Sequence, residues 1–209
     1  MERKGSYEIK EYEVGERVRY RFYTGRLEIL SGKYVEARKT MEEAFKETHS
    51  SQHFHKRLIL LFLIPLKMNS GVLPSLQLLE KYQLLQQYSP FREAILEGDI
   101  GKWEEWMEKE GKEIRRRGLL LVMENVKSIV YRSLFSKLHS FLPKPQLKLD
   151  FFLQALHSIG IQMDMEELQC LLANLIYKGF IKGYLKYPEN FIIFSKKDPF
   201  PSLNQVFGD

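Results

Sequence analysis

The fold is decided by residues 164–195, which read DMEELQCLLANLIYKGFIKGYLKYPENFIIFS. Asp164 and Glu167, three residues apart, form an acidic variant of the capping box that starts a helix, and Gly179 is placed to end it. Between these signals apolar residues recur at helical spacing, at Met165, Leu168, Leu172, Leu175 and Ile176. The pattern therefore predicts one amphipathic helix with a defined start and end.

Two short runs rich in β-forming residues follow this helix, at Phe180–Tyr187 and Phe191–Ser195. They are separated by Pro188-Glu189-Asn190, a turn signal, so they predict a two-stranded wing. A helix that leads directly into such a wing is typical of a winged helix. We therefore expect a module that binds partners rather than one that catalyses a reaction.

The helical pattern extends over most of the chain before this module. Residues 15–48 predict two antiparallel helices with tetratricopeptide-like spacing, in which Gly25, Ala37 and Ala44 are the small positions. Further helices are expected at Lys56–Asn69, Leu76–Gln87, Pro90–Glu97, Lys102–Arg116, Leu119–Leu142 and Asp150–Ser158, the last with Asp150 as its N-cap. The fold class is thus mainly α, with a helical repeat over 15–118, a winged helix over 119–196 and an extended tail over 197–209.

The composition is that of an ordinary globular chain, with 44% hydrophobic and 28% charged residues. The longest apolar run, Leu58–Leu66, is far shorter than the roughly 20 residues that cross a membrane, so we expect no membrane contact. Cys170 is the only cysteine, which excludes a disulfide framework and suits the cytosol or nucleus. We expect Cys170 to be a small core residue.

No pattern of catalytic or metal-binding residues is present. His53 and His55 lack a third ligand at useful spacing, and the adjacent acids of Glu104-Glu105 and Glu166-Glu167 diverge on a helix. A phosphate-binding loop, a nucleophile elbow and a zinc-protease motif are all missing. We therefore expect no enzyme activity, no metal, no cofactor and no small-molecule substrate.

The net charge of +5 is concentrated in residues 111–150, which carry 9 Lys and Arg against 3 Asp and Glu. The densest run consists of Lys112, Arg115, Arg116 and Arg117. Such a run can contact phosphates, with salt-dependent binding, or it can be a solvated helix end whose cations complement the helix dipole. The sequence leaves both interpretations open.

A second basic group consists of Lys178 at the end of the predicted helix and Lys182 and Lys186 on the first wing strand. Residues two apart on a strand share a face, so Tyr184 lies between the two wing lysines. This arrangement suits backbone contact with base stacking. Alternatively, Tyr184 packs within the wing and the lysines protect a sheet edge from pairing.

The chain is identified as a member of the PCI domain family, whose layout is a helical stack ending in a winged helix. Three stretches carry the resemblance: KRLIL at 56–60 with IPLKM at 64–68, QCLLANLIY at 169–177 with Gly179 and KGY at 182–184, and SKKDPFP at 195–201. They are similar to one branch, which holds the PCI subunit of the nuclear transcription-export complex and its signalosome-associated relatives. Family members generally carry more helical residues before the matched region, so we expect a compact member or a fragment.

The resemblance implies a non-enzymatic scaffold that works in mRNA export, in the nucleus at nuclear pores and secondarily in the cytoplasm. It implies side-by-side pairing with a second PCI subunit through the winged helices, with wing contacts at Phe180, Tyr184, Tyr187 and Phe191. It also implies a small acidic disordered subunit lying along the domain. It further implies that RNA or DNA binds a joint basic surface of the two subunits. The candidate residues that this chain contributes are those of its two basic groups: Lys112, Arg115, Arg116, Arg117, Lys178, Lys182 and Lys186.

Two other functions are considered. A protein-only scaffold of the signalosome or proteasome-lid kind would not need the basic segment 111–150. A sequence-specific winged-helix transcription factor should present Arg, Asn or Gln from its recognition helix toward base edges. Here that helix offers Gln169, Asn174 and Lys178 among three acids, which is unfavourable for the major groove.

Overall fold

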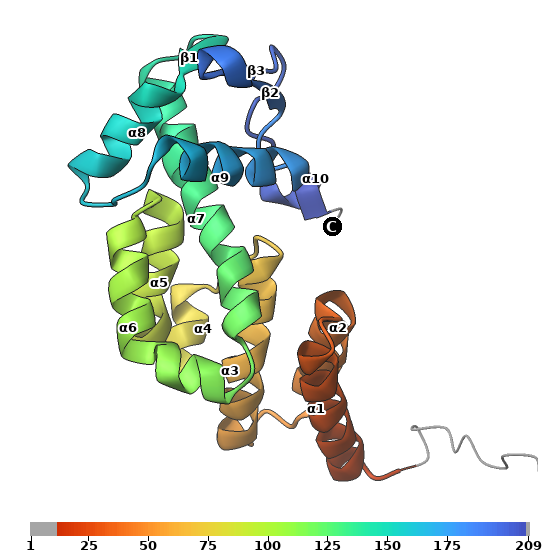
Figure 1. The fold of residues 1–209 in the computed structure, drawn as a ribbon. Helices are drawn as coiled ribbons and strands as arrows, with labels where there is room; N and C mark the ends of the chain where they lie inside the picture. The colour runs from red at the N-terminus through yellow and green to blue at the C-terminus, as the bar shows by residue number, and fades with distance from the viewer. Residues whose placement is uncertain (1–11, 208–209) are drawn as a thin grey trace, which may run out of the picture.

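Helices α1 to α6 form a stack, and the long helix α7 connects this stack to the winged helix (Figure 1). The computed structural model describes residues 12–207. The stack consists of α1 (Val14–Leu30), α2 (Tyr34–Glu47), α3 (His53–Asn69), α4 (Leu76–Lys81), α5 (Leu85–Glu97) and α6 (Ile100–Arg116). The remainder consists of α7 (Leu120–Phe141), β1 (Gln146–Lys148), α8 (Leu149–Ser158), α9 (Met165–Tyr177), β2 (Gly183–Lys186), η2 (Tyr187–Glu189), β3 (Phe191–Phe194) and α10 (Leu203–Phe207).

The first two helices form the antiparallel hairpin that the small residues predict. Gly25 of α1 lies directly against the side chain of Met41, so that a Cβ there would stand only 3.0 Å from it. Ala37 and Ala44 of α2 are completely buried. Their small side chains let the two helices approach closely, and the hairpin then packs on α3 through the rings of Phe22 and Phe62, 5.4 Å apart.

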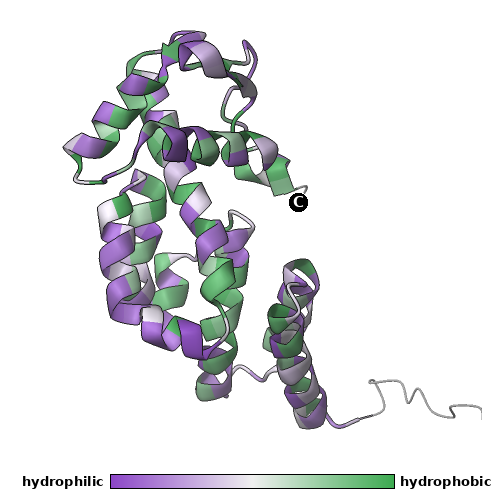
Figure 2. Ribbon diagram, in the orientation of Figure 1, coloured by the Kyte–Doolittle hydropathy of each residue, from purple (hydrophilic) through white to green (hydrophobic). Residues whose placement is uncertain are grey.

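Helices α3 and α7 make the centre of the stack. Every residue from Ile59 to Leu66 on α3 is buried, in agreement with the apolar run in the sequence. Figure 2 shows hydrophobic residues concentrated on α3 and α7, whereas α6 at the outside is largely hydrophilic. Within residues 12–207, each helix is too short or too polar to span a bilayer.

The prediction of a single helix over Leu76–Gln87 is wrong. Helix α4 ends at Lys81, the chain turns at Gln83 with a left-handed φ of 55°, and α5 starts at Leu85. Burial explains the break, because the turn puts Leu84 into the core and its N–H donates to the Leu79 carbonyl at 2.8 Å. Helix α5 consequently starts well before Pro90, which lies inside it.

The turn between α5 and α6 brings the stack against α7. Gly98 ends α5 with φ 66°, and a Cβ at this position would overlap the backbone of Leu134 on α7. Asp99 then caps α6, because its side chain accepts the N–H of Lys102 at 3.0 Å. Only glycine permits both this φ and this close approach.

The wing is a three-stranded antiparallel sheet in the order β1-β3-β2, rather than the two-stranded unit expected. The extra strand, β1, pairs Leu147 with Ile192 of β3, and β2 pairs Leu185 with the same residue. Helix α8 follows β1 at once, so its N-cap is Lys148 and the predicted cap, Asp150, lies in its first turn. There the Asp150 carboxylate complements the helix dipole.

Helix α9 confirms the capping prediction in detail. The Asp164 side chain accepts the Glu167 N–H at 2.8 Å, and the Glu167 side chain accepts the Asp164 N–H at 3.0 Å. The predicted seam of Leu168, Leu172 and Leu175 is completely buried, with Met165 and Ile176 half-buried beside it. The prediction that Cys170 is a core residue is wrong: it is exposed, since two residues from Leu168 is about 200° around the helix.

The segment predicted as an extended tail folds back onto the protein and contains α10. Arg132 of α7 donates from Nη2 to the carbonyl oxygens of Phe200 and Pro201, at 3.2 and 2.6 Å. The ring of Phe207 at the end of α10 lies 5.7 Å from that of Phe180. These long-range contacts, which no local pattern signals, place the helix against the winged helix.

The buried seam of α9 generates the first prediction. Leu172→Ala should lower the free energy of unfolding by about 2–5 kcal/mol, because it removes buried methyl groups and leaves a cavity. Chemical denaturation followed by circular dichroism measures this loss. Cys170→Ala on the exposed side of α9 is the matched control and should change stability by less than about 0.5 kcal/mol. Equal losses in the two variants would contradict the assigned helix face.

Candidate nucleic-acid and partner surfaces

The basic run of the sequence lies at the C-terminal end of α6. The buried side of this helix carries Trp103, Trp106 and Ile114, so Lys112 and Arg115 project to solvent on the other side. The side chain of Arg116 is 81% exposed and lies 3.5 Å from Glu113. These three cations are available to an anionic ligand, and they also complement the helix dipole.

Arg117 differs from its neighbours. Its side chain is only 14% exposed and pairs with Glu113 at 3.2 Å, one helical turn earlier. It is the C-cap residue of α6, where the chain turns toward α7 and carries the side chain inward. The expectation that Arg117 contacts phosphate is therefore at odds with its burial.

Lys178, at the C-terminal end of α9, is directed against α7 instead of outward. Its Nζ donates to Asn125 Oδ1 at 3.4 Å and to Ser128 Oγ at 3.2 Å. The three residues line a polar pocket of about 330 Å³ between the two helices. Burial lowers the pKa of Lys178, since neither neutral partner compensates its charge. Lys178 thus acts first as a link between α7 and α9.

The wing carries the predicted row of a cation, an aromatic ring and a second cation. Lys182 immediately precedes β2, and Tyr184 and Lys186 lie on it; all three side chains are exposed, that of Tyr184 to 59%. Both lysines have acidic neighbours: Lys182 lies 3.5 Å from Asp198, and Lys186 lies 2.8 Å from Glu189. The hydrogen bond and the charge of Glu189 raise the pKa of Lys186.

The four aromatic residues expected to contact a partner divide into two groups. Tyr184 and Tyr187 are more than half exposed on the wing, whereas Phe191 is half-buried under Lys148, whose Nζ lies 5.9 Å from the ring centroid. Phe180 is only 3% exposed. It belongs to the core between α9 and α10, and in this conformation it offers no surface to a partner.

The two basic groups do not form one continuous surface. Arg115 and Arg116 lie just before α7, and the sheet follows its far end, so α7 separates them (Figure 1). The 22 residues of α7 correspond to about 33 Å. The two groups therefore do not share one face, because α7 holds them at opposite ends.

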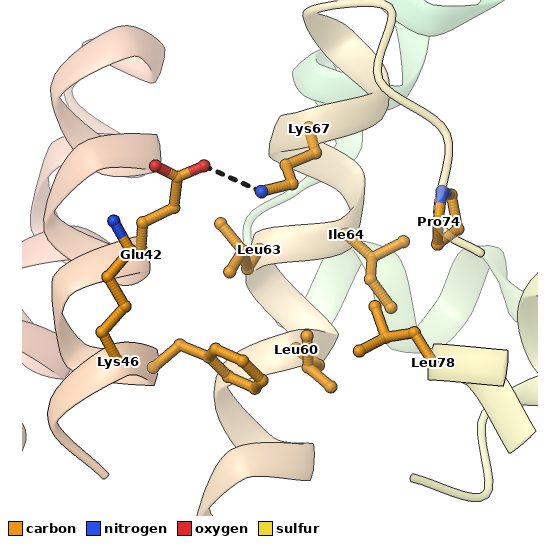
Figure 3. A pocket seen from close by; sticks show the side chains of 9 residues that line it. Glu42, Lys46, Leu60, Leu63, Ile64, Lys67, Pro74 and Leu78 are labelled. Carbon is orange, nitrogen blue, oxygen red and sulfur yellow. Dashed lines mark ion pairs between the residues drawn. The ribbon is translucent and has the colours of Figure 1, made fainter. Parts of the chain in front are cut away.

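Two hollows were not anticipated from the sequence. One is the polar pocket beside Lys178, and the other is an apolar groove between α2, α3 and α4 (Figure 3). Both are formed by residues from different helices, so no local motif signals them. Among residues 12–207, no three His, Cys, Asp or Glu side chains gather in a way that could hold a metal ion. His53 and His55 are exposed.

A stack of helices that runs into a winged helix is the architecture of a class of scaffold proteins. Residues 80–196, more than half of the chain, match the PCI domain, so the chain belongs to the PCI domain family. Domains of this family are typically non-catalytic scaffolds that assemble with other PCI subunits.

Similar proteins occur in distant organisms. The chain is 37% identical over 198 residues to PCI domain-containing protein 2 of Xenopus laevis, a match that covers 94% of this chain and 49% of that protein. It is 34% identical over 194 residues to a homolog of the same name from Drosophila melanogaster, covering 92% and 49%. A protein named CSN12 homolog, from Mycosarcoma maydis, is 29% identical over 210 residues, covering 93% and 46%. The chain thus spans about half the length of these relatives.

The ion pair on the wing generates the second prediction. Glu189→Gln should lower the pKa of Lys186, because it removes the carboxylate that favours the charged ammonium. An NMR titration of the lysine side chains should therefore show Lys186 losing its proton at a lower pH in the variant. Glu166→Gln, on the exposed side of α9, is the control and should leave Lys186 unchanged. An unaltered Lys186 titration in Glu189→Gln would disprove the ion pair.

Proposed function

We propose that the chain is a non-enzymatic PCI scaffold subunit of a nuclear mRNA-export complex coupled to transcription. In this role it pairs with a second PCI subunit, binds a small acidic disordered subunit, and contributes exposed cations that bind RNA or DNA. Nuclear pores are the proposed location, with a further presence in the cytoplasm. The observation that carries the nucleic-acid role is the exposed row of Lys182, Tyr184 and Lys186 on the wing.

The chemistry of this row suits a single-stranded nucleic acid. Two ammonium groups flank an exposed phenol ring, so phosphates can meet the cations while a base stacks on the ring. The acidic neighbours of the lysines do not prevent this, because ion pairs between exposed side chains contribute little. A polyanion that brings several phosphates and releases counterions can replace them.

Lys112, Arg115 and Arg116 provide a second region of positive charge. A ligand that reaches both regions has to extend over the length of α7, about 33 Å. In duplex DNA, at 3.4 Å per base pair along the axis, this distance corresponds to about ten base pairs. We therefore expect duplexes much shorter than this to reach only one region.

The proposed pairing with a PCI subunit uses the wing as well. Strand β2 is at an edge of the sheet, and Tyr184 and Tyr187 are exposed beside it. Exposed tyrosines are favourable interface anchors, because they bury a large area with few rotatable bonds. Because Tyr184 belongs to both proposed contacts, nucleic acid and the PCI partner would meet at the same place on the wing.

A protein-only scaffold of the signalosome or proteasome-lid kind is the alternative. The similarity to the protein named CSN12 homolog supports it. The two functions differ in whether the exposed cations meet nucleic acid, so a binding measurement separates them.

The third prediction concerns nucleic acid. Single-stranded RNA and duplex DNA should bind without strong sequence preference, and affinity should fall steeply with salt. Lys182→Glu with Lys186→Glu, and separately Arg115→Glu with Arg116→Glu, should each lower the slope of log affinity against log salt by about 1.4–1.8, since two contacts are lost. Fluorescence anisotropy at several salt concentrations measures the slopes.

The control reverses the same number of charges elsewhere. Arg19→Glu with Lys39→Glu changes two exposed cations of the α1–α2 hairpin and should leave the slope nearly unchanged. If all three double variants bind like the wild type at low salt, the nucleic-acid role is excluded. The protein-only scaffold would then be the better proposal.

The fourth prediction concerns the PCI partner. Tyr184→Asp with Tyr187→Asp should abolish recovery of a second PCI subunit in pull-downs from nuclear extract, because the interface loses its anchors and gains charge. Both side chains are exposed, so the melting temperature should stay the same. Tyr177→Asp is the matched control, since Tyr177 is 90% exposed but lies on α9 outside the wing. Unchanged recovery with the wing variant would place the interface elsewhere.

A further inference from the structure

The polar pocket of about 330 Å³ between α7 and α9 lies beside the link that Lys178 makes. Ser128 and Tyr131 of α7 are buried and form its inner end, whereas Glu124 and Asn174 are exposed at its mouth. Apart from Leu171, every lining residue carries a polar group. The pocket therefore suits a small polar ligand that is partly removed from water.

The hydrogen bonds inside the pocket leave several donors over. The ammonium of Lys178 has three N–H groups and no acceptor. Asn125 Oδ1 takes one of them at 3.4 Å and Ser128 Oγ takes a second at 3.2 Å. Among residues 12–207, no acceptor contacts the third. Because both neighbours accept from the ammonium, the amide N–H groups of Asn125 and the hydroxyl proton of Ser128 remain able to donate.

Two more lining residues add donors. Within the described part of the chain, the amide of Asn174 and the hydroxyl of Tyr131 form no hydrogen bond with another residue. Burial, and then the negative charges of Glu104 and Glu167, raise the pKa of Tyr131 to about 12. The Tyr131 hydroxyl is thus protonated at neutral pH and can donate. Donors on both helices consequently outnumber the acceptors of the pocket.

The positive charge of the pocket is concentrated at Lys178. The other lining lysine, Lys127, is paired with Glu104 of α6 at 3.4 Å. Lys178 has neutral partners, and burial lowers its pKa, so an anion beside it would stabilise its charged form. The acid of the lining, Glu124, is exposed at the mouth, where solvent and salt screen its charge.

We propose that this pocket binds the phosphate group of a phosphate monoester, whose oxygens accept from the Lys178 ammonium and from the amides of Asn125 and Asn174. The hydroxyls of Ser128 and Tyr131 lie at the inner end of the same pocket. The inference goes beyond the proposed function, which assigns exposed surfaces to this chain and no enclosed ligand site.

A phosphate monoester uses these donors better than other anions do. It presents three terminal oxygens and up to two negative charges, in a tetrahedral arrangement. The donors project from two helices, so a tetrahedral anion can reach more of them than a planar carboxylate can. A phosphate inside a strand carries a substituent on each side, whereas a pocket that ends at Ser128 and Tyr131 favours a group attached on one side. A small phosphate monoester and a phosphorylated strand end share this chemistry.

The test is an NMR titration of the full chain that follows the side-chain amides of Asn125 and Asn174. The probes are inorganic phosphate and adenosine monophosphate, added at constant ionic strength. Both should shift the two amide signals in a saturable manner, because the signals report on donors inside the pocket. Sodium chloride at the same ionic strength, and adenosine without its phosphate, should not.

Matched variants locate the charge. Lys178→Gln should weaken adenosine monophosphate about tenfold, because it removes the cation, whereas Lys137→Gln, exposed elsewhere on α7, should have no effect. Glu124→Gln should strengthen binding several-fold, since it removes a like charge from the mouth. Asn174→Ala, at an exposed position, should weaken binding several-fold at an unchanged melting temperature. The last two variants keep the test decisive even if Lys178→Gln loosens α9 from α7.

A short oligonucleotide with a terminal phosphate, compared with the same strand ending in a hydroxyl, identifies the source of the phosphate. If the phosphorylated strand shifts both amides at lower concentration than adenosine monophosphate does, the ligand is a strand end. If it needs the same concentration or more, the ligand is a small monoester. Either result supports the pocket.

Three outcomes would overturn the inference: amide shifts that chloride reproduces, equal binding by Lys178→Gln and the wild type, and binding that Glu124→Gln leaves unaltered or weakens. The wing has a separate test. Lys182→Glu with Lys186→Glu should leave adenosine monophosphate binding unchanged, so the pocket and the proposed nucleic-acid surface can fail independently.

Discussion

Helix α7 has to bury two sets of residues against two different neighbours, and the rest of the structure depends on this constraint. Its first half places Val122, Val126 and Ile129 in the core of the helical stack. Its second half carries Phe135, whose ring stands edge-on to Phe152 of α8 at 5.3 Å. Because one rigid helix serves both cores, the stack and the winged helix are held in a fixed relation.

Several local features of other segments allow them to pack closely against α7 or to form hydrogen bonds with it. Gly98 lets the α5–α6 turn touch the backbone of α7, and Arg132 ties the C-terminal segment to it through the carbonyls of Phe200 and Pro201. The side chain of Lys178 is partly buried and donates hydrogen bonds to Asn125 and Ser128 of α7. A cation that is used in packing around α7, such as Arg132, is not available to a ligand. The exposed cations of the surface are available.

The exposed surfaces that remain are distinct in chemistry. The wing presents cations around an exposed tyrosine, the end of α6 presents cations alone, and the groove between α2, α3 and α4 presents an apolar floor with lysines at its rim. A rigid body with several different exposed surfaces is well suited to hold partners in a defined arrangement. This arrangement agrees with membership of the PCI domain family. The chain spans only about half the length of its relatives.

The sequence by itself determined the elements whose signals are local. The capping box of Asp164 and Glu167, the leucine seam of α9 and the small residues of the α1–α2 hairpin act within one or two helices, and each prediction held. The alternation over residues 182–186 likewise predicted that Lys182 and Tyr184 are exposed. Such features depend on backbone periodicity and neighbouring hydrogen bonds, which the order of residues specifies directly.

Only the tertiary structure decided the features that depend on long-range burial. Strand β1 is too short to be recognised without its partner β3, and the break at Gln83 exists because Leu84 enters the core. The inward turn of Arg117, the burial of Phe180 and the separation of the two basic regions by α7 follow from packing between distant segments. The sequence identifies a charged or aromatic side chain, but its exposure to solvent depends on which distant segments pack against it.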